Sequence, residues 1–464
     1  MKHMNHTAAL LTLSALLAAS PMQAAEPLTP TVPDSCSVAC QTDRPCQEKR
    51  VRALTSSDDY NKFRFGGYGE MVASFKDYSN NRFYGGQDGN KKDHRNTISI
   101  PRFVLAFDYK FNSKWILGAE IEFESGGVGT AYEIENSENG EYETEVEKGG
   151  EVALEQFHIT RLIHPAFNVR AGHIILPVGL TNEHHEPVNF FGTVRPEGET
   201  TIIPSTWHEN GLEIFGSFGK DYARFDYEAI VAAGLNACGF DRNNWVQGGK
   251  QGIFEEDNFT SPAYVFRLNY NGVPGLRIGG SFYYCANTTA NSDKLTEYAF
   301  RAPLRIYTAD AQYKNRIVTA RANFMWGSLT NADRVSAVNT KLSNKSPYSR
   351  VVPVANRTVS YGAEVGLNLA GIFEGTKCPV IYPFARFDYY NPQKKCAGLY
   401  TEDKRAEVRK WSAGVNWYAL PNLVVKADYA TRQIGTSKLF GKGKYNSENE
   451  FSIGVAYVGW FTRK

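Results

Sequence analysis

The stretch FRFGGYGEMVASF, Phe63–Phe75, alternates strictly between two kinds of side chain. One face carries Phe63, Phe65, Gly67, Met71, Ala73 and Phe75, and the other carries Arg64, Tyr68, Glu70 and Ser74. Successive side chains of a β-strand point to opposite faces, so this period of two predicts a strand with one apolar and one polar face. The same alternation recurs in Arg102–Phe111 and Lys114–Glu124.

Similar segments continue to the end of the chain. They are Val152–Ile163, Asn168–Ile175, Trp207–Phe215, Tyr222–Leu235, Pro262–Asn269, Leu276–Cys285, Leu304–Tyr313, Arg316–Trp326, Thr358–Leu369, Val380–Tyr390, Glu407–Tyr418, Leu423–Thr431 and Glu450–Phe461. Together with the first segments they predict about sixteen strands in an all-β protein.

The lengths of the connections distinguish the possible β architectures. Tight turns such as Asn112-Ser113, His164-Pro165 and Lys314-Asn315 alternate with long polar stretches. The long stretches are roughly 76–97, 125–151, 176–206, 236–261, 286–303, 327–357, 391–406 and 432–448. Outer-membrane barrels have short periplasmic turns, long external loops and an even number of strands, whereas soluble sandwiches lack this regular asymmetry. The pattern therefore predicts a transmembrane antiparallel β-barrel.

Composition agrees with a barrel and excludes other classes. The chain has 28 Phe, 26 Tyr and 41 Gly, which suit half-buried strands and tight turns. The formal net charge of +2 gives no basis for binding nucleic acid by bulk attraction. No run approaches about 18 apolar residues, so a membrane role must rest on strands.

The first residues favour export. Lys2 and His3 precede the apolar run Ala8–Ala19, and the small residues Ala24 and Ala25 follow. This order is typical of a signal peptide, although a buried N-terminal helix is the alternative. We expect residues 1–25 to be a signal peptide, 26–60 a periplasmic linker and 61–464 the barrel. The protein is then expected in the outer membrane, in contact with lipid and lipopolysaccharide.

The motif VRAGHIILPVGLTNEHHEP, Val169–Pro187, ends a strand with Pro-x-Gly-Leu and opens the long stretch 176–206. It resembles the phosphate-selective porin O and P family, and the architecture agrees over roughly residues 60–464. The resemblance implies that this third loop folds inward and narrows a pore for small hydrophilic solutes or ions, including anions such as phosphate. The chain departs from the family at its C-terminus, where Thr462-Arg463-Lys464 follow the terminal aromatic residue.

The polar faces of the strands predict the wall of the pore. The expected pore-lining residues are Arg64, Glu70, Arg102, Asp108, Glu120, Arg224, Asp226, Arg267, Arg277, Arg321, Lys426 and Asp428. The family's anion preference depends on a basic wall, whereas this wall carries both signs of charge. A mixed wall sets up a transverse field and favours neither anions nor cations strongly.

The third loop carries the expected constriction residues His184, His185, Arg195 and Glu197. The densest group of histidines and carboxylates lies around them, with Glu183, Glu186, His208 and Glu209. Imidazole and carboxylate suit zinc or copper, but adjacent residues rarely bind the same metal ion. We therefore favour the interpretation that these residues line the constriction loop over the interpretation that they form a metal site. We expect no cofactor and no metal. The acidic run Glu133–Glu151 is interpreted as a solvated external loop.

No catalytic motif occurs: Gly-x-Ser-x-Gly, His-Glu-x-x-His and the Walker loop are all absent from the sequence. We therefore expect a channel and no enzyme, with a homotrimer left open as its assembly. The alternative is a barrel for adhesion or envelope structure with a blocked lumen. Sequence does not separate the two, because the packing of the loops decides whether the lumen is open.

The seven cysteines include two that bracket a predicted strand, Cys378 and Cys396. A strand of about eleven residues at roughly 3.3 Å each separates them by far more than the 7 Å that a disulfide spans. We predict that they do not pair, and that Cys238 and Cys285 are better candidates.

Overall fold

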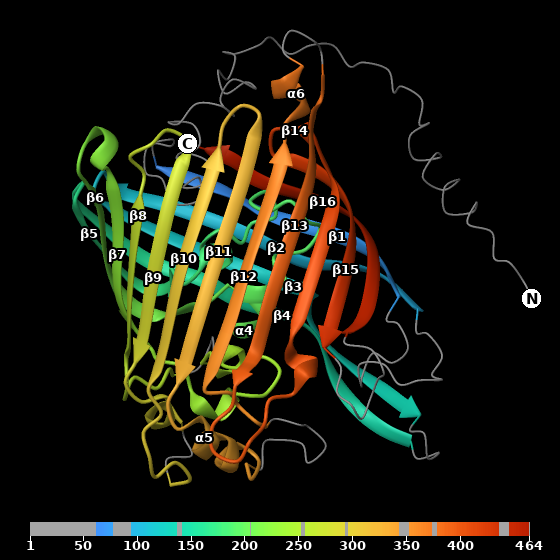
Figure 1. Cartoon of the computed structure of the whole chain (residues 1–464). Coiled ribbons are helices and arrows are strands. Elements are labelled where there is room, and N and C mark those ends of the chain that lie inside the picture. Colours follow the sequence, from blue (N-terminus) through green and yellow to red (C-terminus); the bar gives the residue numbers. More distant parts are fainter. Residues whose placement is uncertain are drawn as a thin grey trace, which may run out of the picture.

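The computed structural model describes most of the chain beyond residue 61. The described residues are 62–77, 94–136, 142–204, 206–251, 256–292, 296–342, 352–373, 378–435 and 445–463. The expected signal peptide and the whole of the expected linker lie outside them. The described residues form sixteen strands in one closed barrel, in which every strand is antiparallel to its sequence neighbours and β1 pairs with β16 (Figure 1).

The strands are β1 (Phe63–Asp77), β2 (His94–Asn112), β3 (Trp115–Asn136), β4 (Tyr142–His164), β5 (Phe167–Ile175), β6 (His208–Phe218), β7 (Phe225–Ala232), β8 (Ala263–Tyr270), β9 (Leu276–Cys285), β10 (Leu304–Lys314), β11 (Val318–Leu329), β12 (Arg357–Leu367), β13 (Val380–Lys395), β14 (Val408–Leu420), β15 (Leu423–Gly435) and β16 (Tyr445–Arg463). The helices of the connections are α3 (Leu180–Glu183), α4 (Glu197–Ile202), α5 (Ala332–Asn339), α6 (Leu369–Ile372) and the 3-10 turns η2 (Asp221–Ala223), η3 (Ala237–Gly239), η4 (Gln247–Gly249), η5 (Thr288–Asn291) and η6 (Lys404–Ala406).

The predicted fold class is confirmed, because each segment with alternating polarity is a strand. One expectation was wrong: the stretch 125–151 is mostly strand, since β3 and β4 continue far past the other strands (Figure 1). Their extensions pair with each other from Gly129↔Gly150 to Asn136↔Tyr142. Tyr132 and Ile134 alternate with Glu133 and Glu135 there, so the period of two persists inside the acidic run.

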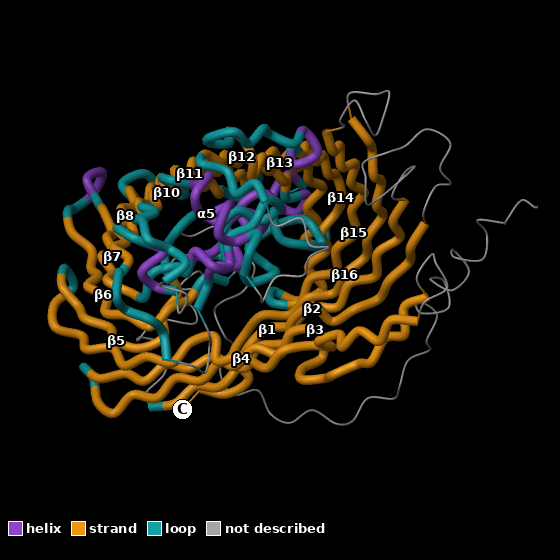
Figure 2. The backbone as a smooth tube through the Cα atoms, turned by 90° about the horizontal axis from the view of Figure 1, so that it is seen from below, coloured by secondary structure: helices purple, strands orange, loops and turns teal. Residues whose placement is uncertain are grey.

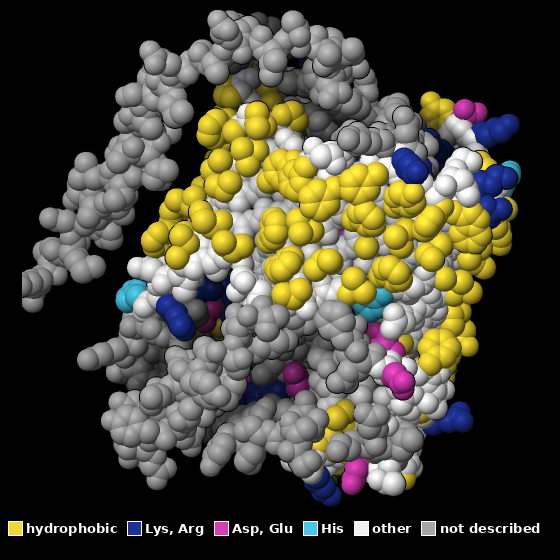
Figure 3. All heavy atoms as spheres, turned by 180° about the vertical axis from the view of Figure 1, so that it is seen from behind, with side chains coloured by type: hydrophobic (Ala, Val, Ile, Leu, Met, Phe, Trp, Pro, Cys, Tyr) yellow, Lys and Arg dark blue, Asp and Glu magenta, His cyan; other side chains and the backbone are white. Residues whose placement is uncertain are grey.

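The outer face of the barrel is apolar. Large hydrophobic side chains are exposed on strand after strand, among them Phe103, Phe157, Phe266, Phe324 and Val365. Figure 3 shows them as a broad belt across the outer surface. A contiguous apolar surface of this size needs lipid around it, and a closed barrel leaves no open strand edge within the hydrocarbon. The barrel is therefore a membrane-spanning one, of the type found in the outer membrane.

Among the described residues, no helix has the length and apolar character needed to cross a membrane.

Several long connections, as far as their residues are described, fold over and into one end of the barrel. Loop and helical segments lie inside the ring of strands when the barrel is seen from its end (Figure 2). A buried apolar cluster joins these loops to the inner wall and includes Trp207, Phe240, Trp245 and Tyr283. The indole Nε1 of Trp245 donates to the carbonyl of Ala355 at 2.8 Å, which ties two of the loops together.

Disulfide expectations had mixed outcomes. Cys378 and Cys396 carry free thiols, which confirms that the two do not pair. The proposed bond between Cys238 and Cys285 was wrong, because the buried thiol of Cys285 is directed instead at the carbonyl of Ser261, 3.4 Å away.

Candidate functional site

The loop between β5 and β6, residues 176–206, lies inside the barrel, and we call it the constriction loop. Its two ends are joined where it leaves the wall, because Leu176 N donates to Trp207 O at 2.8 Å. The buried side chain of Asn182 strengthens this closure by donating to the carbonyl of Leu176 at 2.6 Å. The loop therefore turns into the lumen at a fixed point on the wall.

Local features of the sequence shape the loop. Gly179 has φ of 85°, in the left-handed region that favours glycine, and it starts the turn into α3. The carboxylate of Glu199 accepts the backbone N–H groups of Leu180 at 3.2 Å and Thr181 at 2.6 Å. It also accepts a hydrogen bond from Asn323 of β11 at 2.9 Å. One buried carboxylate thus joins both helices of the loop to the barrel wall.

Buried cations of the wall hold carbonyl groups of the loop. The Lys426 ammonium on β15 donates to the carbonyls of Pro187, Phe190 and Gly192, the last two at 2.8 Å each, and it is only 2 % exposed. Three arginines on other strands act in the same way: Arg102 donates to His185 O at 2.9 Å, Arg267 to Gly179 O at 3.3 Å and Arg386 to Val194 O at 3.1 Å. These charge-assisted bonds fix the path of the loop backbone.

Wall carboxylates accept the N–H groups of the loop in turn. Asp428 accepts Thr193 N at 2.7 Å, and Glu364 accepts Phe191 N at 3.3 Å. The ring of Phe191 stacks on Phe384, with centroids 5.4 Å apart. A Cβ atom on Gly366 would lie 2.4 Å from Cζ of Phe191, so only glycine leaves space for this ring.

Contacts to the loop come from strands on opposite sides of the barrel. Arg102 lies on β2, Arg267 on β8, Asn323 on β11 and Lys426 on β15. A loop that reaches all of them must cross the lumen, as its position within the ring of strands shows (Figure 2). The constriction loop thus divides the cross-section of the barrel.

Neighbouring histidines of the loop have opposite electrostatic surroundings. His184 Nε2 lies 2.7 Å from a guanidinium nitrogen of Arg277, and burial together with that positive charge lowers the pKa of His184 to about 3. Burial also disfavours charge on His185, but Glu155 lies 3.2 Å from its Nε2 and raises the pKa of His185 to about 9. Glu183 is half-buried beside Arg267 and Arg277, and although burial opposes ionisation, their charges hold the pKa of Glu183 well below its usual range.

A small hollow, with room for about one water molecule, lies between the loop and the wall of β11, β12 and β13. The loop contributes Thr181, His184 and Phe190 to its lining. The wall contributes Asn323 and both signs of charge, from Arg321, Glu364, Arg386 and Asp388. The wall side of this space is therefore lined mainly by polar and charged groups.

The expected pore-lining residues fall into distinct groups. Arg102, Arg267, Arg277, Lys426 and Asp428 are bonded to the constriction loop. Other expected residues form ion pairs or hydrogen bonds along the wall: Arg64 with Asp108, Glu70 with Arg102, and Arg321 with Glu364. Arg224 and Asp226 lie beside η2, at the end of the barrel with the short turns, and Asn271 donates to Asp226.

The expected constriction residues all lie on the inward loop. His184 and His185 are directed at Arg277 and Glu155 respectively. Arg195 donates to the hydroxyl of Thr206 at 2.9 Å. Glu197 pairs with Arg432 of β15 at 3.1 Å, and although burial opposes ionisation, the charges of Lys410 and Arg432 bring the pKa of Glu197 to about 2.

Several residues at this site were not identified from the sequence. They are Glu155, Glu199, Glu364, Arg386 and Asp388. Glu364, Arg386 and Asp388 lie on the inward faces of β12 and β13, so the alternation that identified the other wall residues also contains them. Glu199 carries no such signal, because its role depends on where the loop meets β11.

The chain is similar to known proteins at low sequence identity. No protein-family model matches the chain. An uncharacterized protein of Aquifex aeolicus is 25% identical over 370 residues, which are 78% of this chain and 74% of that protein. The structure of OmpF of Salmonella typhi in complex with daunomycin superposes with a TM-score of 0.51 at 12% identity, and covers 87% of this chain and 99% of OmpF. An anion-selective porin from Comamonas acidovorans superposes with a TM-score of 0.49 at 9% identity, over 86% of this chain and 99% of the porin.

At this level of identity the likeness shows the fold. The chain has the fold of outer-membrane porins, and its sixteen-stranded barrel with an apolar belt lies in the outer membrane.

Proposed function

We propose that the protein is a passive diffusion channel of the outer membrane for small hydrophilic solutes and ions, and that it catalyses no reaction. The observation that carries the proposal is the constriction loop, which wall side chains on β2, β8, β13 and β15 hold across the lumen of a porin-type barrel. Barrels of this strand number enclose an aqueous channel, and an inward loop sets the size of the molecules that pass.

The charge pattern supports weak ionic selectivity. The basic groups beside the hollow are matched by carboxylates, since Arg321 pairs with Glu364 and Arg386 donates to Asp388 at 2.8 Å. Paired charges present a transverse dipole to a passing solute and little net charge. We therefore propose that neutral polar solutes pass, together with ions of either sign, and that anions such as phosphate are among them, as the resemblance to the phosphate-selective porins implies. The homotrimer remains a proposal for the assembly.

Planar-bilayer recording tests this function. Folded protein in symmetric potassium chloride should give stepwise, ohmic conductance, and a salt gradient should give a reversal potential close to zero. Protein denatured by heat before addition is the control for detergent artefacts. A large reversal potential would contradict weak selectivity, and its sign would show whether anions are preferred. Folded, inserted protein without conductance would contradict the channel and favour a barrel with a blocked lumen.

A further inference from the structure

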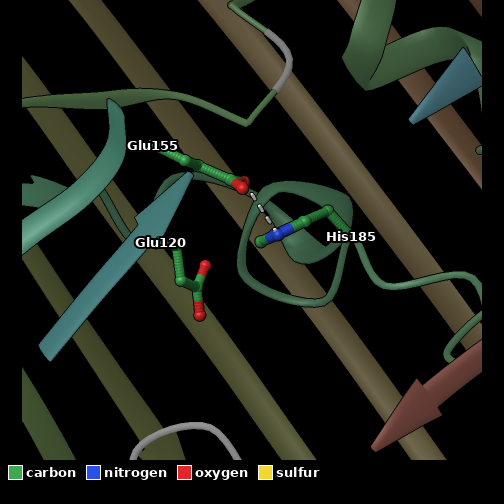
Figure 4. Close-up of side chains that lie close together, drawn as sticks. All are labelled: Glu120, Glu155 and His185. Carbon is green, nitrogen blue, oxygen red and sulfur yellow. Dashed lines mark ion pairs between the residues drawn. The ribbon is translucent and has the colours of Figure 1, made fainter. Parts of the chain in front are cut away.

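Three side chains of the kinds that bind metal ions, from distant parts of the chain, lie close together where the constriction loop meets the wall. They are Glu120 of β3, Glu155 of β4 and His185 of the loop, and one ligand atom of each lies within 4.8 Å of the others. All three are buried, with 5 %, 0 % and 3 % of their surfaces exposed. Figure 4 shows the carboxylate of Glu155 and the imidazole of His185 directed toward one another, with Glu120 beside them.

The imidazole of His185 is oriented as in a residue that binds a metal ion. Its Nδ1 lies 2.9 Å from the carbonyl of Asn182, which can only accept, so Nδ1 is the donor and Nε2 is directed toward the carboxylates. Histidines that bind metals usually donate their other ring N–H to a carbonyl or carboxylate, which fixes the tautomer. Nε2 lies 3.2 Å from Oε1 of Glu155, but the geometry of this contact is not that of a hydrogen bond. This buried nitrogen therefore has a charged neighbour but no hydrogen-bond partner.

Surrounding groups orient the two carboxylates. Gln156 donates to Glu120 at 2.7 Å, and the hydroxyl of Tyr68 lies 3.3 Å and 3.4 Å from the two oxygens of Glu155. Arg102 fixes the backbone of the histidine by donating to the carbonyl of His185 at 2.9 Å. Metal-binding carboxylates are commonly held by such outer hydrogen bonds, which leave the other oxygens directed at the ion.

Charge in this part of the lumen favours a cation. The guanidinium group of Arg102 interacts with the carboxylates of Glu70, Glu122 and Glu155, whereas the carboxylate of Glu120 faces Glu155 and His185. One oxygen each of Glu70 and Glu122 is buried without a hydrogen-bond partner. Glu120 and Glu155 repel each other when both are ionised, and a divalent cation between them would remove this repulsion.

We propose that Glu120, Glu155 and His185 bind a divalent transition-metal ion that ties the constriction loop to β3 and β4. One imidazole and two carboxylates form a donor set suited to zinc, manganese or cobalt. Three protein ligands leave at least one position for water or a passing solute. The inference rests on these side chains alone and does not depend on whether the barrel conducts.

The simpler alternative is an ion pair in which a protonated His185 faces Glu155. Glu155 raises the pKa of His185 to about 9 although burial opposes the charge, so a metal ion must displace this proton. The other charged and titratable groups that interact with the ring are Glu120 and Glu122 of β3, Arg102 of β2, Tyr68 of β1, Glu186 of the loop and His208 of β6.

Cobalt binding to the folded full-length protein in detergent tests the site. Equilibrium dialysis against Co²⁺, followed by atomic absorption, should show one equivalent more in the wild type than in His185→Gln. His184→Gln is the matched control: it changes the adjacent, equally buried histidine, whose ring faces Arg277, and it should keep the wild-type stoichiometry. Visible absorption distinguishes this nitrogen and oxygen site from the cysteines, because thiolate ligands add a charge-transfer band.

Two further variants complete the test. Gln156→Leu removes the hydrogen bond to Glu120 and should weaken Co²⁺ binding about 10- to 100-fold. Glu120→Gln keeps the His185–Glu155 pair and should also bind one Co²⁺ ion fewer than the wild type. This variant tests the site even if His185→Gln fails to fold. Heat-modifiable gel mobility identifies the folded protein. The inference is overturned if folded wild type binds no more Co²⁺ than Glu120→Gln, because the pair is then an ion pair alone.

Discussion

The constriction loop should loosen when the ammonium of Lys426 is removed. Lys426→Met keeps the length and the apolar stem of the side chain but leaves the carbonyls of Pro187, Phe190 and Gly192 without their donor. It also removes the contact of the ammonium with the Phe190 ring, whose centroid lies 4.2 Å away.

Two opposing effects determine how much free energy of loop docking Lys426→Met loses. Each buried acceptor left without a donor costs about 1–3 kcal/mol. The substitution also abolishes the cost of burying the ammonium, which amounts to several kcal/mol. We expect a net weakening of loop docking of about 2 kcal/mol, which raises the population with a displaced loop about 30-fold.

Single-channel recording measures this effect. Lys426→Met should show noisier open currents and a higher mean conductance than the wild type. Arg64→Met is the matched control, because it removes an equally buried cation whose ion pair with Asp108 joins β1 to β2 in the wall. It should leave the current unchanged if it folds. Currents of folded Lys426→Met that match the wild type would refute the role of Lys426 in holding the loop.

Three further perturbations test separate parts of the structure. Gly366→Ala places a methyl group against Phe191 and should raise conductance at a cost of about 1–3 kcal/mol in loop packing, whereas Gly280→Ala, which has ordinary space, should not. The His185–Glu155 pair raises the pKa of His185 from 6.5 to about 9, so its contribution to docking is complete below pH 6.5 and is lost as pH rises through about 9. In metal-free protein the conductance should therefore rise across this range, and a rise of equal size in His185→Gln would contradict it. The strand register is tested by a membrane-impermeant thiol reagent on single-cysteine variants at Leu105, Val455, Asp108 and Arg321. Labelling should be confined to Asp108 and Arg321, and equal labelling at all four would refute the register.

The barrel was predictable from sequence because its signal is local. Alternation in segments such as Arg102–Phe111 depends only on residues that are near in the chain, and a strand with one face in lipid repeats it each time. One wrong expectation came from overlooking this signal. The acidic stretch 125–151 was interpreted as a loop, although Tyr132 and Ile134 alternate with acidic residues there, and it forms the extended hairpin of β3 and β4.

The partners of the inward side chains were not predictable. Lys426 reads from sequence as one more polar residue on a strand, yet it lies 236 residues along the chain from its acceptor Phe190. Such a contact depends on barrel closure and on the path of the loop, neither of which leaves a local pattern. For the same reason Glu155 was overlooked, although its position opposite His185 defines the proposed metal site.

The most direct test of the account is the conductance of a protein whose constriction loop has been shortened. Deleting Glu186–Arg195 removes the segment held by Lys426 and Asp428, so the folded variant should conduct more and admit larger sugars in liposome swelling. Deleting residues 130–148, in the β3–β4 hairpin, is the control and should leave both quantities close to wild type. If the variant lacking Glu186–Arg195 inserts and conducts as the wild type does, the constriction lies elsewhere in the barrel.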